Sequence, residues 1–169
     1  MYEIGEYIVY GVKGVCRIED IAHIDISGAD KNRLYYVLVP LGDASGKIYA
    51  PTDSEKMTIR KVISKEEASE LIQELPEIEL LWVPDDRQRE ARYKEALRTC
   101  DYRAWVSIVK TLYVRKRQRV EQGKKITALD EKYMKAAEDE LYSELSISFG
   151  VPKEEMESYI KEKIKAIKQ

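Results

Sequence analysis

The hydrophobic pattern of the chain changes its period near residue 64, and this change limits the possible folds. Before it, short runs of β-branched and aromatic residues are separated by turn-forming Gly, Asp, Asn and Pro. After it, apolar residues recur at the spacing of amphipathic helices. We therefore expect an α+β protein of two domains: residues 1–63 form a small antiparallel β-barrel, and residues 64–169 form an all-α domain of five helices. The expected strands are residues 7–10, 15–18, 21–26, 34–39 and 47–50.

Start and stop signals divide the second domain into its helices. Ser64 and Glu67 have the spacing of a capping box. Gly123 and Gly150 are expected to end the third and fourth helices. Trp105 lies on the apolar stripe of the third helix, so we expect it in the core. The five helices are expected to begin at Ser64, near Asp85-Asp86, and at Asp101, Thr127 and Pro152.

Composition excludes several classes of protein. No apolar run reaches the roughly 18 residues of a membrane helix, and the N-terminus lacks the pattern of a signal peptide, so we expect a cytoplasmic protein. Cys16 and Cys100 are expected to be buried thiols, and His23 is the single histidine. Structural zinc needs four ligands, and no catalytic motif occurs. We therefore expect no metal, no cofactor, no small-molecule substrate and no enzymatic activity.

The net charge of −2 conceals a segregation of charge along the chain. Charged residues make up 36% of the sequence, above the roughly 25% usual for soluble domains. The first 65 residues are neutral, residues 66–86 carry −8, residues 87–125 carry +9 and residues 126–169 carry −3. The whole-chain charge therefore excludes only a uniformly basic nucleic-acid binder.

The +9 segment contains two basic clusters, one on the second expected helix and one where the third helix ends. A run of charges is often only a solvated helix face. Two clusters on helices that must pack near each other also suit phosphate binding, and both interpretations stay open. The clusters are Arg87, Arg89, Arg92, Lys94 and Arg98, then Arg115, Lys116, Arg117, Arg119, Lys124 and Lys125.

The opening segment resembles the start of CarD/CdnL-type bacterial transcription regulators. Residues 4–19 read IGEYIVYGVKGVCRIE, which is similar to that family's apolar-Gly-Asp/Glu start, apolar-Val-Tyr strand, turn ending in Gly and second apolar strand. The family's Pro-x-His-Gly turn is here GVKG at residues 11–14. Residues 92–94, 111–113 and 137–145 resemble the family's helical half. The same barrel opens the polymerase-binding module of transcription-repair coupling factors, where a helicase follows.

This resemblance implies a Tudor/SH3-like domain that docks on the β subunit of bacterial RNA polymerase. It also implies a helical domain that contacts promoter DNA near the upstream edge of the −10 element and stabilises the open complex. We expect a monomer, associated with the nucleoid through the polymerase. The alternative is a protein-interaction adaptor without direct DNA contact. The expected DNA-contacting residues are Trp82, Arg87, Arg89, Arg92, Lys94, Arg115, Lys116, Arg119 and Lys124.

The sequence departs from the family at the tryptophan that wedges into DNA. In the family this residue lies four positions before the Tyr of the Arg-Tyr-Lys segment, a position that holds Arg89 here. Trp82 lies earlier, in a loop bracketed by Pro76 and Pro84. Either Trp82 takes the role of the wedge or Arg contacts in the minor groove replace it. The other interpretation of Trp82 is packing beneath its own loop.

The polymerase-binding residues are expected on one edge of the barrel. Pairing of an edge strand with a strand of the β subunit supplies backbone hydrogen bonds, and alternate side chains supply specificity. Tyr49 is the first candidate for such a contact, and a place in the barrel core is its alternative. The exposed aromatic residues are expected to be Tyr35, Tyr36 and Tyr49, and the polymerase-binding residues are expected to be Tyr35, Lys47, Ile48 and Tyr49.

Overall fold

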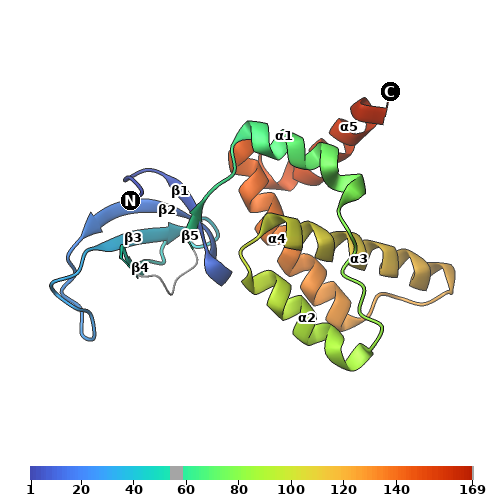
Figure 1. The fold of residues 1–169 in the computed structure, drawn as a ribbon, viewed down its shortest axis with the longest axis horizontal. Helices are drawn as coiled ribbons and strands as arrows, with labels where there is room; N and C mark the ends of the chain where they lie inside the picture. Colours follow the sequence, from blue (N-terminus) through green and yellow to red (C-terminus); the bar gives the residue numbers. More distant parts are fainter. Residues whose placement is uncertain (54–58, 169) are drawn as a thin grey trace. The chain divides into compact units, whose positions relative to one another are not determined.

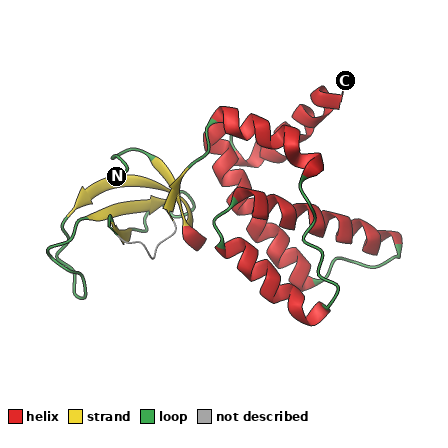
Figure 2. Ribbon diagram, in the orientation of Figure 1, coloured by secondary structure: helices red, strands yellow, loops and turns green. Residues whose placement is uncertain are grey.

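The computed structural model describes residues 1–53 and 59–168. The chain separates into two compact units, Met1–Val62 and Ile63–Gln169. The strands belong to the first unit and the described α-helices to the second, as Figure 1 shows by position along the chain and Figure 2 by type of element. An antiparallel sheet followed by five helices confirms the predicted α+β class.

Five antiparallel strands form the sheet of the first unit. Their order across the sheet is β4-β3-β2-β1-β5, so β4 and β5 are the edge strands of the described sheet. The predicted turn between β1 and β2 is a 3-10 turn, η1 (Gly11–Lys13). Gly11 and Gly14 have φ angles of 45° and 76°, in the region that favours glycine. The strands are β1 (Tyr7–Tyr10), β2 (Gly14–Ala22), β3 (Tyr35–Pro40), β4 (Ile48–Pro51) and β5 (Ile59–Lys61).

The strand prediction was wrong in two places. Residues 15–18 and 21–26 are not separate strands, because β2 continues through Glu19 and Asp20 to Ala22. The register of β2 against β3 shifts between Ile18 and Asp20, and this irregularity accommodates the polar pair without ending the strand. The sequence pattern also misses β5, whose short Ile-Arg-Lys run forms by pairing with β1.

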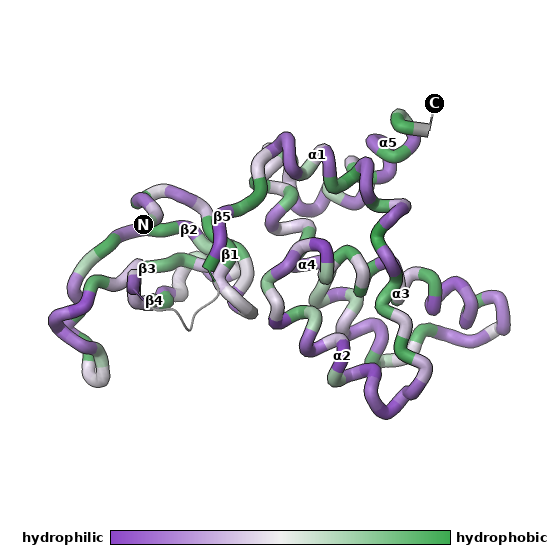
Figure 3. The backbone as a smooth tube through the Cα atoms, in the orientation of Figure 1, coloured by the Kyte–Doolittle hydropathy of each residue, from purple (hydrophilic) through white to green (hydrophobic). Residues whose placement is uncertain are grey.

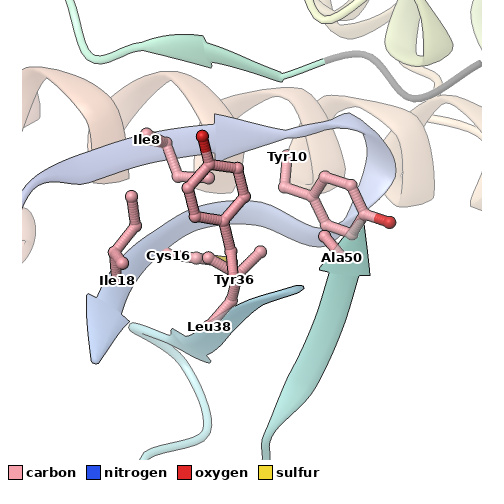
Figure 4. Close-up of a cluster of buried hydrophobic side chains, with 7 residues drawn as sticks. All are labelled: Ile8, Tyr10, Cys16, Ile18, Tyr36, Leu38 and Ala50. Carbon is pink, nitrogen blue, oxygen red and sulfur yellow. The ribbon is translucent and has the colours of Figure 1, made fainter. Parts of the chain in front are cut away.

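One face of the sheet carries the hydrophobic core of the first unit. Figure 4 shows these side chains lying together, with alternate residues of each strand directed to the same face. Tyr36 belongs to this core and is not an exposed aromatic residue, since its hydroxyl accepts a 3.0 Å hydrogen bond from the N–H of Tyr2 and its ring packs on the Tyr2 ring. The core residues are Ile8, Tyr10, Cys16, Ile18, Tyr36, Leu38 and Ala50.

The caps predicted at Ser64, Asp101 and Thr127 are present, and Asp85 caps the second helix. Ser64 and Glu67 exchange both hydrogen bonds of a capping box, and Gly150 ends the fourth helix in a left-handed conformation. The side chains of Asp85, Asp101 and Thr127 each accept a hydrogen bond from a backbone N–H in the first turn of their helix. The described helices are α1 (Lys65–Glu74), α2 (Asp86–Arg98), α3 (Tyr102–Glu121), α4 (Ala128–Phe149) and α5 (Met156–Lys168).

The fifth helix begins later than predicted. Pro152 is extended and precedes a 3-10 turn, η3 (Lys153–Glu155), so α5 begins at Met156. A second 3-10 turn, η2 (Leu75–Glu77), follows α1. No helix among the described residues is long and apolar enough to cross a bilayer.

The core of the second unit lies between α2, α3 and α4. One cluster joins Tyr93 of α2 to residues of α3 and α4, and Trp105 is fully buried, as predicted. Ile63 begins the unit and is fixed to α4, since its N–H donates to Glu144 and its carbonyl accepts from Ser148. Figure 3 shows a predominantly hydrophilic tube along α2 and along the connection from α3 to α4, where the basic clusters lie.

Candidate functional site

Three helix ends meet at one end of the helical unit. Asp130 lies in the first turn of α4, where Thr127 caps the helix, and its side chain is fully buried. Nε of Arg115, in the last turns of α3, donates a 2.9 Å hydrogen bond to Oδ2 of Asp130. A terminal nitrogen of Arg89, in the first turns of α2, lies 3.6 Å from Oδ1. Asp130 therefore joins one arginine from each of the two basic clusters of the sequence.

Arg89 is not part of an exposed basic surface. The residue is only 7% exposed and its guanidinium pairs with Asp86 at 2.7 Å as well as with Asp130. We expected Arg89 to contact DNA, and its burial corrects this expectation. Its guanidinium is held by Asp86 and Asp130 of the same unit. Arg115 is also mostly enclosed by its ion pair, with a side chain 19% exposed.

Five further cations lie close in the sequence to these helix ends. They are exposed and have no ion pair among residues 1–53 and 59–168. Arg119 is half-buried, and its Nε donates to the carbonyl of Lys125, which closes the turn from α3 to α4. The basic end of the helical unit consists of Arg87, Lys116, Arg117, Lys124 and Lys125.

The other predicted cations of α2 lie further along that helix. Arg92 and Arg98 are exposed. Lys94 is exposed as well and forms a 3.4 Å ion pair with Glu90. The Tyr133 hydroxyl donates a 3.0 Å hydrogen bond to Glu90, which lowers the pKa of that carboxyl. These contacts fix the middle of α2 on α4 and leave Arg92 facing solvent.

The loop before α2 holds Trp82 in an exposed position. The N–H of Leu81 donates a 2.7 Å hydrogen bond to the hydroxyl of Thr111, and the hydroxyl of Ser107 donates to the carbonyl of Glu79. Nζ of Lys110 donates to the carbonyls of Leu75 and Ile78, both at 2.6 Å. Leu81 packs on the core, whereas Trp82 is 56% exposed. The alternative in which Trp82 packs beneath its loop is therefore excluded.

The edge strand β4 presents the predicted residues of the first unit on different faces. Tyr49 is 37% exposed and pairs with Val37 of β3, on the face opposite the core. Ile48 packs partly against the core, and Lys47 is exposed with its Nζ 3.6 Å from Glu19. β4 is an edge strand of the sheet, so a further strand can be added beside it.

A comparison with protein-family models finds one domain. Residues 2–63 match the model of the CarD-like/TRCF RID domain. The first unit is a CarD-like/TRCF RID domain. This confirms the resemblance of the opening segment and indicates an RNA polymerase-interacting family. A search of curated proteins finds no match to the chain.

Tyr35 of the RID domain is not an exposed contact residue. It is only 7% exposed, and its hydroxyl accepts a 3.2 Å hydrogen bond from the N–H of Asp30. The loop between β2 and β3 therefore covers the residue. Of the four residues predicted to bind polymerase, Lys47 and Tyr49 are exposed on the RID domain and Ile48 is half-buried.

Sequence reasoning missed the residues that position Trp82 and the basic end. Ser107, Lys110 and Thr111 are polar residues at helical spacing within the mostly apolar first half of α3, a pattern that could have indicated a chain segment bound along that face. Asp130 follows an N-cap and resembles any acidic residue of a first helical turn, so its sequence context gives no signal of burial.

Proposed function

We propose that the protein is a transcription regulator that binds the β subunit of bacterial RNA polymerase through its RID domain. Its basic end contacts promoter DNA near the upstream edge of the −10 element and stabilises the open complex. The observation that carries the DNA contact is that Asp130 joins the two helix segments on which exposed cations lie, the first turns of α2 and the last turns of α3. An exposed tryptophan lies in the loop that leads into α2. The chain is a monomer without catalytic activity, located in the cytoplasm and associated with the nucleoid through the polymerase.

The polymerase contact is assigned to the β4 edge. Strand addition would supply main-chain hydrogen bonds along Ile48–Pro51. The exposed ring of Tyr49 and the cation of Lys47 would then supply the specificity of the interface. The RID domain match supports a polymerase contact through this domain, since it indicates an RNA polymerase-interacting family.

The DNA contact combines charge with one aromatic side chain. Lys116, Lys124 and Arg87 suit phosphate oxygens, because all three side chains are exposed and form no ion pair with the described residues. Trp82 is an exposed apolar ring directly after an anchored residue of its loop, which suits insertion at an unstacked base step. Such a small number of contacts gives weak binding to free DNA, so the polymerase contact must supply the local concentration.

Charge reversal at the basic end tests this proposal. The double variant R87E/K116E is compared with K65E/K165E, which reverses two exposed cations of the same unit outside the basic end. The lifetime of the open complex after competitor challenge and the affinity for polymerase are measured separately. We expect R87E/K116E to shorten the lifetime and to reduce the salt dependence of DNA binding by about two charges, with polymerase affinity unchanged.

The other outcomes separate the alternatives. Loss of polymerase affinity in R87E/K116E favours an adaptor that uses its basic end on protein. An unchanged lifetime with polymerase still bound contradicts the DNA contact. Equal loss in K65E/K165E indicates an effect of overall charge, which also contradicts a local contact surface.

A further inference from the structure

Asp130 is the buried anion at the centre of the basic end. Its two oxygens face two different helices: Oδ2 accepts from Arg115 at 2.9 Å, and Oδ1 lies 3.6 Å from Arg89. Neither Oδ1 of Asp130 nor Nε of Arg89 has a hydrogen-bond partner in the described structure. Because a buried carboxylate stays charged only beside compensating cations, the three side chains depend on one another.

The N-terminal half of α2 has little else to hold it. Within residues 86–92, all of which are described, Arg89 is the only buried residue and no apolar side chain is buried. Glu90 of this segment also contacts α4, where it accepts a hydrogen bond from Tyr133 and interacts with the charge of Lys132. The placement of Arg87 and Arg92 therefore depends mainly on polar contacts. Among these contacts, the Arg89–Asp130 ion pair is the one whose two side chains are both buried.

The C-terminal half of α3, from Tyr113 onward, also lacks buried apolar side chains that would hold it against α4. No residue from Tyr113 to Glu121, a fully described segment, is buried. Arg115 is the residue of this segment that forms an ion pair with α4, through Asp130. The cations Lys116 and Arg117 follow directly after it. One carboxylate thus fixes both helix segments that carry the exposed cations.

We infer that Asp130 is the positioning residue of the basic end. It holds the first turns of α2 and the last turns of α3 against α4, and it keeps Arg89 and Arg115 directed inward. Only the exposed cations of the basic end then face the DNA, and Asp130 determines the distances between them. This inference rests on the proposed DNA contact and adds to it the group that determines its geometry.

Asp130→Asn gives a test in which geometry and charge predict opposite results. The substitution removes one negative charge, so a surface that acts by charge alone would bind DNA more tightly. We expect the open-complex lifetime to fall by about tenfold instead, because the cations that contact DNA lose the group that holds them in place. Amide exchange should become faster in residues 86–92 and 113–121, and the affinity of the RID domain for polymerase should not change.

Arg115→Lys keeps every charge, and it tests the same positioning role if Asp130→Asn does not fold. Lysine lacks the Nε donor that bonds Oδ2, so we expect a smaller loss of lifetime in the same direction. Arg117→Lys is the matched control, because Arg117 is exposed and unpaired within the described chain and should tolerate the exchange.

The outcomes distinguish this inference from the proposed function. A shortened lifetime in Asp130→Asn, or in Arg115→Lys but not Arg117→Lys, supports the positioning role. A lifetime equal to or longer than that of the wild type in both variants, while R87E/K116E shortens it, overturns the positioning role and leaves the DNA contact standing. No effect of R87E/K116E itself overturns both.

Discussion

The N–H of Leu81 donates a 2.7 Å hydrogen bond to the hydroxyl of Thr111, a buried residue of α3. The same hydroxyl donates to the carbonyl of Ser107 at 2.7 Å. This relationship fixes the loop one residue before Trp82, and the Asp85 cap fixes it on the other side. The exposed ring is therefore held on an ordered segment, where it can be presented to a ligand at little entropic cost.

Thr111→Val should release this anchor. Valine has nearly the shape of threonine but no acceptor, so the Leu81 N–H loses its partner. We expect the free energy of unfolding to fall by about 1–3 kcal/mol and the Leu81 amide to exchange faster. Ser107→Ala, which removes a more exposed bond to Glu79, is the control and should cost less. Unchanged protection of the Leu81 amide would show that the bond does not hold the loop.

Trp82→Ala should separate function from stability. The side chain is exposed, so the free energy of unfolding should change by no more than about 0.5 kcal/mol. The open-complex lifetime should shorten, because the ring that occupies the unstacked step is lost. Leu80→Ala is the matched control, an exposed apolar residue of the same loop. Equal lifetimes for wild type and Trp82→Ala would exclude Trp82 as a wedge and leave the cations as the contact.

Tyr49→Ala should weaken binding to the polymerase β subunit by about tenfold or more, as expected for an aromatic residue central to an interface. Tyr113→Ala removes a comparably exposed tyrosine from α3 and should leave polymerase affinity unchanged. Titration of each variant with the β subunit measures both. Wild-type affinity in Tyr49→Ala would move the polymerase contact away from the β4 edge.

Glu140 should make the helical unit less stable as the pH rises. Burial raises the pKa of Glu140 from 4.5 to about 7, although Lys153 opposes the shift. The stability that belongs to the protonated carboxyl is therefore complete below about pH 4.5 and is lost as the pH rises through about 7.

Glu140→Gln tests this dependence. At pH 8 the substitution should increase the free energy of unfolding by about 1–2 kcal/mol, a value reduced for partial solvent screening. At pH 5 it should have little effect, because the wild-type carboxyl is then mostly neutral. Denaturant unfolding at the two pH values measures the difference. A stabilisation of equal size at both would contradict the raised pKa.

Local signals in the sequence predict the helices of this protein well. Ser64 with Glu67, and the caps at Asp85, Asp101 and Thr127, each act on N–H groups within their own first turn, so a short stretch of sequence contains the whole interaction. The same holds for Gly150, whose left-handed conformation ends α4.

Long-range pairing decides the features that the sequence does not predict. β2 continues past Glu19 because β3 pairs with it on both sides of the register shift, and β5 exists because β1 pairs with it. Arg89 is buried because it forms an ion pair with Asp130, a residue far along the chain on another helix. Residue type and local spacing favour exposure for an arginine in a polar helix, so only the fold reveals its ion pair.

The most direct test of the DNA contact is site-specific crosslinking in the open complex. A benzophenone amino acid replaces Trp82 in one sample and Lys165 of α5, outside the basic end, in a control sample. Crosslinks are mapped on promoter DNA with polymerase present. We predict a crosslink from position 82 to bases at the upstream edge of the −10 element, with none from position 165. Polymerase-bound protein that crosslinks to DNA from neither position, or from both equally, would contradict the specific DNA contact at Trp82 that the proposed function combines with the basic end.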